Sequence, residues 1–364
     1  LSTGLPHPFR GVNIGSWLVL EKWMTPDVFS GTNTTDQFTF DSIENGKAKL
    51  QHHWETFFTE NDMAQIATWG LNAVRIPIGY WAYDNTGTRY ISGADAYLEQ
   101  AIGWARKHGI KVLVDCHGSP GSQNGFDNSG QAGSINWQSG DNLQRSIDIL
   151  VTMAKKYGSV DYADVVFALE IVNEPASWAP NDFSVTQQWA QQAYSAVKGA
   201  STNPNLIVVM HDSFEGPALW QTIGAAINGP NTTYTDSHFA LDVHLYQNMM
   251  PDDSKLTQPQ HINKACSDWS TTEFLSPDSH LPVFVGEFSA ATNICVNPDN
   301  STIGGSECTI DGCQCLSNVP MEDWSAGAKV WTRKFFEAQM LTFERHGAGW
   351  FLWSYKVPDG GAWS

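Results

Sequence analysis

VVFALEIVNEP, residues 165–175, and VFVGEF, residues 283–288, are two apolar runs that each reach a glutamate near their end. An apolar run of four to eight residues bounded by Pro or Gly is typical of a strand buried on both faces. Such strands form parallel sheets, and the carboxyl ends of the strands in a parallel barrel make the edge where functional groups gather. Glu174 and Glu287 are therefore candidates for two functional carboxyl groups at one edge of a barrel.

Six further apolar runs resemble these two, and segments with helical character separate them. The eight expected strands cover residues 12–18, 73–77, 112–116, 165–172, 206–210, 239–244, 283–285 and 349–353. Helices that end close to a glycine are expected over residues 94–108, 143–157 and 331–345. The alternation predicts an α/β fold, a (β/α)8 TIM barrel. An open doubly wound sheet is the alternative, but no Gly-rich phosphate loop follows the first strand.

The chain of 364 residues contains no linker-like tract and no repeat of fixed period, so we expect one catalytic domain over residues 1–364. Its net charge of −18 repels phosphate groups. This charge therefore argues against nucleic acid and against an anionic membrane surface as partners. No apolar run reaches the ~18 residues of a membrane span. The 16 Trp and 18 Phe residues suit two uses, the core of a large barrel and stacking on the apolar faces of sugar rings.

Several features suggest an extracellular protein. The chain begins Leu1-Ser2-Thr3-Gly4, without an initiator Met, as expected of a processed mature form. Three glycosylation sequons begin at Asn33, Asn231 and Asn300, each in a polar, loop-like stretch. We therefore expect a secreted, glycosylated protein, and we expect it to be a monomer.

Four of the six cysteines lie in a Gly- and Asp-rich loop over residues 293–315, and two readings of them compete. They could bind zinc or form disulfides. Their spacing does not fit the paired Cys-x2-Cys pattern of common zinc sites, and disulfides suit a secreted chain. Disulfides are favoured. Cys116 is expected to be a buried free thiol, and Cys266 has no obvious partner.

Polar or aromatic residues end seven successive predicted strands. They are Arg75, His117, Asn173 with Glu174, His211 with Asp212, His244 with Tyr246, Glu287 and Trp353. Buried singly, each polar group would need its own partner. Because these residues are expected to gather on one rim of the barrel, they predict a functional site there. Two carboxyl groups there suggest cleavage of a glycosidic bond, in which one protonates the leaving oxygen and the other attacks the sugar.

The constellation resembles glycoside hydrolase family 5, and within it the fungal secreted exo-1,3-β-glucanases. The matching motifs span nearly the whole chain and cover residues 10–21, 74–81, 115–130, 173–175, 242–246, 286–287 and 350–354. The resemblance implies a retaining double displacement with Glu174 as the general acid/base and Glu287 as the nucleophile, about 5 Å apart. It implies that no metal or organic cofactor is needed.

The resemblance also implies a set of substrate-binding residues. They are Glu21, Arg75, His117, Phe126, Asp127, Asn128, Asn173, His244, Tyr246, Met249 and Trp353. Arg75 would keep Glu287 ionised, because a nearby cation favours the charged form. Asn173 would hold the sugar's 2-hydroxyl, and His244 and Tyr246 would orient the two glutamates. By analogy with relatives, Cys295 is expected to pair with Cys313, and Cys308 with Cys315.

Some features depart from the glucanase pattern. Phe288 stands where many members have Trp, Met249 stands where an aromatic clamp residue is expected, the Cys-rich loop is unusual, and the sequence stops at Ser364. We expect Phe126, Met249 and the Cys-rich loop to line the entrance beside Glu174. An alternative substrate is therefore a flavonoid diglycoside, as in the rutinosidase-type diglycosidases that release a whole disaccharide. An endo-acting cellulase or mannanase with an open groove, and a catalytically silent carbohydrate-binding barrel, are further alternatives.

Overall fold

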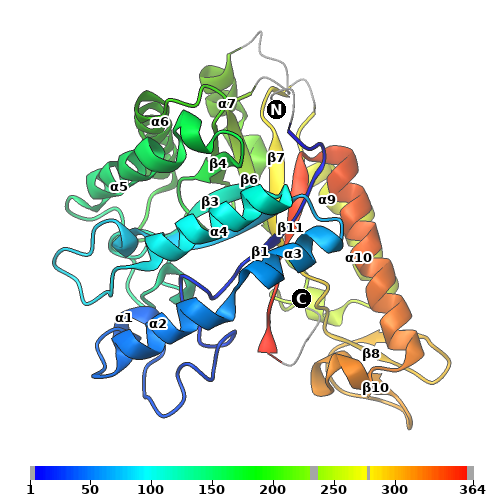
Figure 1. Cartoon of the computed structure of the whole chain (residues 1–364). Coiled ribbons are helices and arrows are strands. Elements are labelled where there is room, and N and C mark those ends of the chain that lie inside the picture. Colours follow the sequence, from blue (N-terminus) through cyan, green and yellow to red (C-terminus); the bar gives the residue numbers. More distant parts are fainter. Residues whose placement is uncertain (1–4, 230–236, 277–278, 359–364) are drawn as a thin grey trace.

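Eight parallel strands close into a barrel, and helices surround it (Figure 1). The computed structural model describes residues 5–229, 237–276 and 279–358. Around the barrel the strands follow the order β1-β11-β7-β6-β5-β4-β3-β2. Their bounds are β1 Phe9–Asn13, β2 Ala73–Gly79, β3 Lys111–Gly118, β4 Val166–Glu170, β5 Ile207–His211, β6 Phe239–Leu245, β7 Val283–Phe288 and β11 Gly349–Leu352. The predicted (β/α)8 barrel is confirmed.

Helices lie between the strands and outside the barrel. Their bounds are α1 Gln37–Phe40, α2 Gly46–Phe57, α3 Glu60–Thr68, α4 Ala94–His108, α5 Asn142–Tyr157, α6 Phe183–Ala200, α7 Gln221–Asn228, α8 Gln258–Asn263, α9 Trp269–Thr272 and α10 Ala326–His346. The expected helix over residues 94–108 is α4, which ends at Gly109 in the left-handed conformation. The helix expected to begin at Trp331 begins five residues earlier, because the Ser325 side chain accepts a hydrogen bond from the Ala328 amide at 3.1 Å and caps it.

The first strand was predicted in the wrong place. It was expected over residues 12–18, but it covers Phe9–Asn13 and pairs with β11 and β2. The apolar residues that follow, including Trp17 and Leu18, are fully buried in a loop instead. Burial made this loop look like a strand, because an apolar run alone does not distinguish a strand from a buried irregular segment.

The barrel interior is built in layers, because residues two apart on a strand point to the same side. An apolar layer fills the end where the strands begin, and there the Phe9 and Phe167 rings stack with centroids 4.2 Å apart. Along β3, Leu113 belongs to this apolar layer, and the next residues on the same side of the strand are Asp115 and then His117. The apolar layer therefore closes one end of the barrel and leaves the other end to polar groups.

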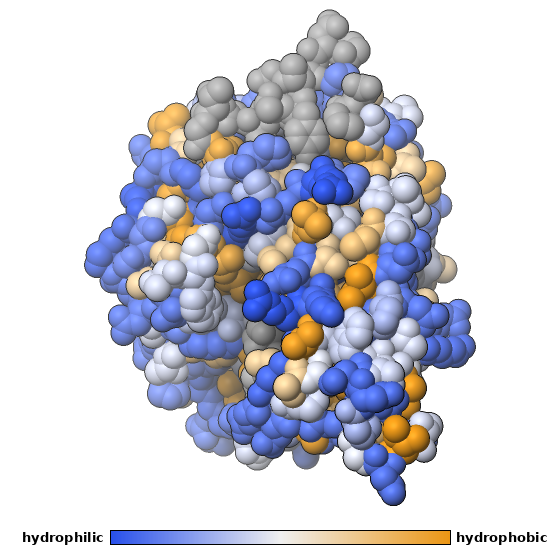
Figure 2. Space-filling view, turned by 90° about the vertical axis from the view of Figure 1, so that its right-hand side faces the viewer, coloured by the Kyte–Doolittle hydropathy of each residue, from blue (hydrophilic) through white to orange (hydrophobic). Residues whose placement is uncertain are grey.

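The side of the molecule that carries α10 is mostly hydrophilic, and its hydrophobic patches are small and separate (Figure 2). Among the residues that the structure describes, no helix is long and apolar enough to cross a membrane.

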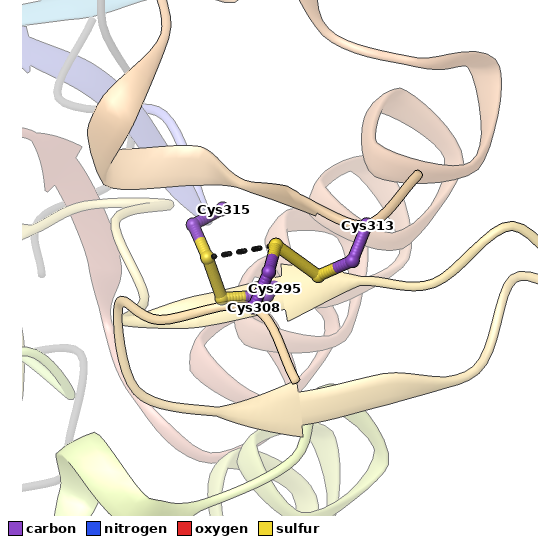
Figure 3. Close-up of side chains that lie close together, drawn as sticks. All are labelled: Cys295, Cys308, Cys313 and Cys315. Carbon is purple, nitrogen blue, oxygen red and sulfur yellow. Dashed lines mark hydrogen bonds between the residues drawn. A yellow bond between two sulfur atoms is a disulfide. The ribbon is translucent and has the colours of Figure 1, made fainter. Parts of the chain in front are cut away.

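The Cys-rich loop forms a small antiparallel sheet in the order β10-β8-β9 near the start of α10 (Figure 1). Its strands are β8 Ile294–Val296, β9 Thr302–Gly304 and β10 Gln314–Cys315. The disulfides join Cys295 to Cys315 and Cys308 to Cys313 (Figure 3). The predicted pairs, Cys295 with Cys313 and Cys308 with Cys315, are wrong. The register of β8 and β10 places Cys315 directly opposite Cys295, which leaves Cys308 and Cys313 for each other. Cys116 is a buried free thiol, and Cys266 is free and exposed.

Candidate active site

A buried arginine lies at the centre of the charged layer above the apolar plug. Two nitrogens of the Arg75 guanidinium, Nε and Nη2, donate to Glu170 at 2.7 and 3.0 Å. The third nitrogen, Nη1, donates to Glu287 Oε1 at 3.0 Å, and Asp115 lies 3.1 Å from Nη2. Arg75 also donates to the Asn173 side chain at 2.8 Å. These partners come from several strands, so the arginine fixes the strand ends relative to one another and supports the floor of the site.

Glu174 lies in the loop after β4, in a backbone conformation that few side chains adopt. Its φ is +46°, in the left-handed region. His244 Nδ1 lies 2.7 Å from Glu174 Oε1, and the Asn128 amide donates to Oε2 at 2.7 Å. Both carboxylate oxygens are therefore held in place, which offsets the strain of the backbone.

Glu287 lies inside β7, at the opposite side of the same cavity. The Tyr246 hydroxyl donates to its Oε2 at 2.8 Å. His244 Nδ1 lies 2.7 Å from Glu174 and 3.5 Å from Glu287, so the facing oxygens are no farther apart than the sum of these distances. That bound lies below the ~6.5 Å at which inverting glycosidases begin and fits the closer carboxyl groups of retaining ones.

His244 contacts both glutamates and shifts their pKa values. Burial alone would lower its pKa, but Glu287, Asp242 and Glu174 raise the pKa well above its ordinary value. Asp242 lies 3.1 Å from its other ring nitrogen, so carboxylates face both nitrogens. Burial would raise the pKa of Glu174, but the hydrogen bonds and charge of His244 lower it to about 2. Burial raises the pKa of Glu287, and His244 and Arg75 offset this only in part. Both shifts favour the ion pair of a protonated His244 and an ionised Glu174.

A cavity of about 920 Å³ opens above the two glutamates. Ten of the thirteen predicted catalytic and substrate-binding residues line it: Glu21, Phe126, Asp127, Asn128, Glu174, His244, Tyr246, Met249, Glu287 and Trp353. Arg75, His117 and Asn173 do not line it and are fully or almost fully buried. The His117 ring stacks on Trp353 in nearly parallel planes, with centroids 5.8 Å apart.

Three buried polar atoms at this site lack a protein partner in the part of the chain described. They are Glu21 Oε1, His117 Nε2 and Asn173 Nδ2. A buried polar atom without a hydrogen bond is costly, so it is either hydrated or reserved for a ligand. Asn173 Nδ2 donates, Glu21 Oε1 can accept, and the role of His117 Nε2 depends on the tautomer of a ring whose Nδ1 lies 2.6 Å from Asp115. A ring of such groups suits the hydroxyls of a sugar.

Sequence reasoning missed several residues of the site. Glu170, Asp115 and Asp242 hold Arg75 and His244 from below. The sequence signal that could have found them is a charged residue inside an otherwise apolar strand. Asp115 precedes His117 by two residues, and Asp242 precedes His244 by two residues. Trp23, Trp178, Phe214 and Met250 also line the cavity. They come from loops, where no periodic pattern marks them.

Two expectations about the entrance were wrong. No residue of the 293–315 loop lines the cavity, because that loop packs beside α8 and the start of α10 instead. Phe288 is fully buried away from the cavity, where its ring stacks on Phe336 with centroids 5.5 Å apart. The substitution of Trp by Phe at this position therefore belongs to the packing of the barrel against α10. Phe126 and Met249 do line the cavity.

A parallel barrel that holds two carboxylic acids about one cavity at its carboxyl edge defines a class of protein, the barrel glycoside hydrolases. The family model described as cellulase (glycosyl hydrolase family 5) matches residues 34–312. The chain belongs to glycosyl hydrolase family 5 and is a glycoside hydrolase.

Curated relatives and a solved structure agree with this assignment. The chain is 35% identical to a glucan 1,3-beta-glucosidase of Blumeria graminis, over 97% of this chain and 83% of that protein. It is 36% identical to a probable glucan 1,3-beta-glucosidase A of Emericella nidulans, over 99% and 88%. The crystal structure of rutinosidase from Aspergillus niger superposes with a TM-score of 0.70 at 21% identity, over 97% and 91% of the two chains. At that identity the likeness concerns the fold.

Proposed function

We propose that the protein is a retaining β-glucosidase that removes glucose from 1,3-β-glucan by double displacement. The observation that carries the proposal is that His244 Nδ1 lies within 3.5 Å of both Glu174 and Glu287, which keeps one oxygen of each carboxylate closer than the ~6.5 Å of inverting enzymes and so supports retention. The names of the curated relatives at 35–36% identity supply the substrate class.

In the first step, Glu287 attacks the anomeric carbon while Glu174 protonates the leaving oxygen. The bond from that carbon to the leaving oxygen breaks, and a glycosyl ester forms on Glu287. The proton comes from the His244–Glu174 pair, in which transfer from Nδ1 to Oε1 leaves neutral histidine and a carboxylic acid. Arg75 and Tyr246 favour the ionised form of Glu287 that attacks.

In the second step, Glu174 accepts a proton from water while the water oxygen attacks the sugar and releases Glu287. Esterification removes the charge of Glu287, which had repelled the charge of Glu174. Loss of that repulsion favours ionised Glu174, the form that acts as a base. Glu174 is therefore ionised when water attacks, and the proton that it then accepts returns the His244–Glu174 pair to its starting state.

The buried polar atoms that lack a protein partner would bind the sugar whose anomeric carbon is attacked. We assign Glu21, His117 and Asn173 to its hydroxyls, with Asn173 at the 2-hydroxyl, and Trp353 to its apolar face. Asp127 and Asn128 line the same cavity, and the Asn128 amide also binds Glu174.

A flavonoid diglycoside is the second candidate substrate. Met249 stands where an aromatic clamp is expected, and Met249 and Met250 are 60% and 62% exposed at the cavity. Thioether side chains adapt to flat apolar surfaces. This wall would accept a flavonoid as readily as a glucose ring.

We also propose that the protein is secreted and glycosylated. Two disulfides favour an oxidising compartment. Asn33 and Asn300 are exposed, so both sequons are accessible, whereas Asn231 lies outside the described residues. Mass spectrometry of the protein from its natural secretions, before and after glycan removal, tests this.

A hydrolysis panel tests the function. Laminarin, an aryl β-glucoside and rutin are compared, and the products and the first-formed anomer are identified by NMR. The proposal expects glucose from laminarin, with the β-anomer formed first. Rutinose from rutin and no glucose from laminarin would establish the second candidate. An initial α-anomer would refute retention, and activity on none of the three would favour a catalytically silent barrel.

A further inference from the structure

Asp242 contacts the ring nitrogen of His244 that does not face Glu174. Both residues lie on β6, and their side chains are each 1% exposed. The Asp242 carboxylate lies 3.1 Å from His244 Nε2, and His244 Nδ1 lies 2.7 Å from Glu174 Oε1. Asp242, His244 and Glu174 therefore form a buried chain of hydrogen bonds that ends on the proposed general acid/base.

Gly286 holds the second oxygen of the Asp242 carboxylate. The register of β6 against β7 shifts just before His244, and Gly286 is the residue of β7 that is passed over. Its amide donates to Asp242 Oδ1 instead. A Cβ atom at position 286 would overlap Asp242 Oδ2, so a glycine must precede Glu287 for this carboxylate to reach His244.

The Asp242 carboxylate determines which nitrogen of His244 keeps its proton. Burial would raise the pKa of Asp242, but the charge and hydrogen bond of His244 lower it, so the carboxylate is ionised. An ionised carboxylate only accepts hydrogen bonds, so Nε2 keeps its proton. Nδ1 is then able to give a second proton to Glu174 and to take it back. If Nε2 lost its proton, the neutral ring would carry its one proton on Nδ1 and could not accept another there.

No other group in the described part of the chain replaces Asp242 at this nitrogen. The charged and titratable groups around His244 are Arg75 of β2, Glu174 of the loop after β4, His211 and Asp212 at the end of β5, Asp242 of β6 and Glu287 of β7. The two glutamates face Nδ1. Burial lowers the pKa of His211 to about 3, so this ring is neutral. Arg75 lies 3.9 Å from Asp242 and has closer carboxylate partners.

We propose that Asp242 is a positioning residue, which keeps a proton on His244 Nε2 and thereby lets His244 Nδ1 exchange a second proton with Glu174. The inference rests on the proposed function, in which Glu174 is the general acid/base. In the first step the proton moves from Nδ1 to Glu174 and on to the leaving oxygen. In the second step Glu174 takes a proton from water and returns it to Nδ1. Asp242 keeps its charge throughout.

Asp242→Asn tests this, because it removes the charge at nearly constant size. The Gly286 amide needs an acceptor, so the new amide oxygen should face Gly286 and the NH2 group should face His244 Nε2, which can then only accept. On laminaribiose we expect kcat/KM to fall about tenfold to a hundredfold. Its alkaline limb should move to lower pH by about one unit or more, because the negative charge that holds the proton is gone. An activated aryl β-glucoside, whose leaving group needs little protonation, should be much less affected.

Asp115→Asn is the matched control. Asp115 lies 2.6 Å from His117 Nδ1 and has the same two-residue spacing on β3, but His117 is assigned to the sugar and not to Glu174. This variant should lower kcat/KM on both substrates by the same factor and leave the alkaline limb in place. Equal losses on the two substrates for Asp242→Asn, or an alkaline limb that does not move, would overturn the proposal.

Nitrogen NMR of protein labelled with 15N-histidine provides a readout that does not need turnover. Near neutral pH, the His244 signals, assigned through the backbone, should show protons on both ring nitrogens in the wild type. In Asp242→Asn they should show a neutral ring with its proton on Nδ1. A neutral His244 in the wild type, which needs no variant to fold, would reject the proposal, as would a doubly protonated ring in Asp242→Asn. If the wild type hydrolysed no β-glucoside, the proposed function would fail, while these signals would still show whether Asp242 holds the proton.

Discussion

Glu174 and Glu287 occupy the same cavity in different settings. Glu174 lies on a loop in a left-handed conformation, bound by His244 and Asn128. Glu287 lies inside a barrel strand, bound by Arg75 and Tyr246. His244 can exchange a proton with Glu174, which suits a general acid/base. Arg75 and Tyr246 stabilise the ionised form of Glu287, which suits a nucleophile that attacks as an anion.

Substitution of each glutamate should give a different kinetic result. Glu287→Ala should remove nearly all turnover on every substrate, because no glycosyl ester can form. Glu174→Ala should lower kcat/KM by about 10²–10⁴-fold on laminaribiose and much less on an activated aryl glucoside, whose leaving group needs little protonation. Steady-state kinetics on both substrates measure this. Equal losses for Glu174→Ala on the two would show that the acid role is misassigned.

The hydroxyl of Tyr246 should set the acid limit of activity. Burial raises the pKa of Glu287, and the hydrogen bond from Tyr246 counteracts this by favouring the ionised form. Tyr246→Phe removes this hydrogen-bond donor, so the pKa of Glu287 rises further. On acidification, the variant therefore loses activity at a higher pH than the wild type does. The acid limb of the kcat/KM profile should move up by about one pH unit.

The matched control for that profile is Tyr97→Phe, which removes a surface hydroxyl that donates to Glu55. Its pH profile should coincide with that of the wild type. An acid limb that stays in place in Tyr246→Phe would show that the hydroxyl does not tune Glu287.

At the scale of elements, β8, β9 and β10 form a sheet separate from the barrel, and both disulfides lie in the loop that carries it. Cys295–Cys315 closes a loop of sequence separation 20 and joins two strands, whereas Cys308–Cys313 spans a separation of 5. A longer closed loop restricts the unfolded chain more.

Removing the two disulfides separately should therefore have unequal effects. The Cys295→Ser/Cys315→Ser double variant should have a lower melting temperature than Cys308→Ser/Cys313→Ser, and both should keep hydrolytic activity, since no residue of the loop lines the cavity. Calorimetry and a glucoside assay measure the two quantities. Peptide mapping without reduction should find the pairs 295–315 and 308–313, and a peptide that joins Cys295 to Cys313 would contradict this arrangement.

At the scale of the whole molecule, buried histidines link stability to pH. His53 on α2 is buried and its Nε2 lies 2.8 Å from the Ser16 carbonyl oxygen. Burial lowers its pKa from 6.5 to about 4. Between these two values the unfolded chain binds a proton that the folded protein does not, so stability is lost as the pH falls through this window. The loss from this residue amounts to roughly 3 kcal/mol.

His53→Asn should flatten the dependence of unfolding free energy on pH between about pH 6.5 and pH 4. Urea denaturation at several pH values measures the slope. His346→Asn changes an exposed histidine in the last turn of α10 and should leave the slope unchanged. A His53→Asn slope equal to that of the wild type would mean that other groups carry the acid sensitivity.

The sequence by itself determined the barrel and the two glutamates. Apolar runs buried on both faces and helices that end at glycine are local signals, and α4 was predicted to its exact bounds for that reason. Tertiary structure decided the rest. The cysteine pairing depends on the register of β8 and β10, and the Arg75 network joins strands nearly a hundred residues apart. The aromatic residues Phe126, Trp178 and Phe214 of the cavity lie on loops that meet only when the barrel closes. These features rest on contacts between distant segments, and such contacts leave no periodic trace in the sequence.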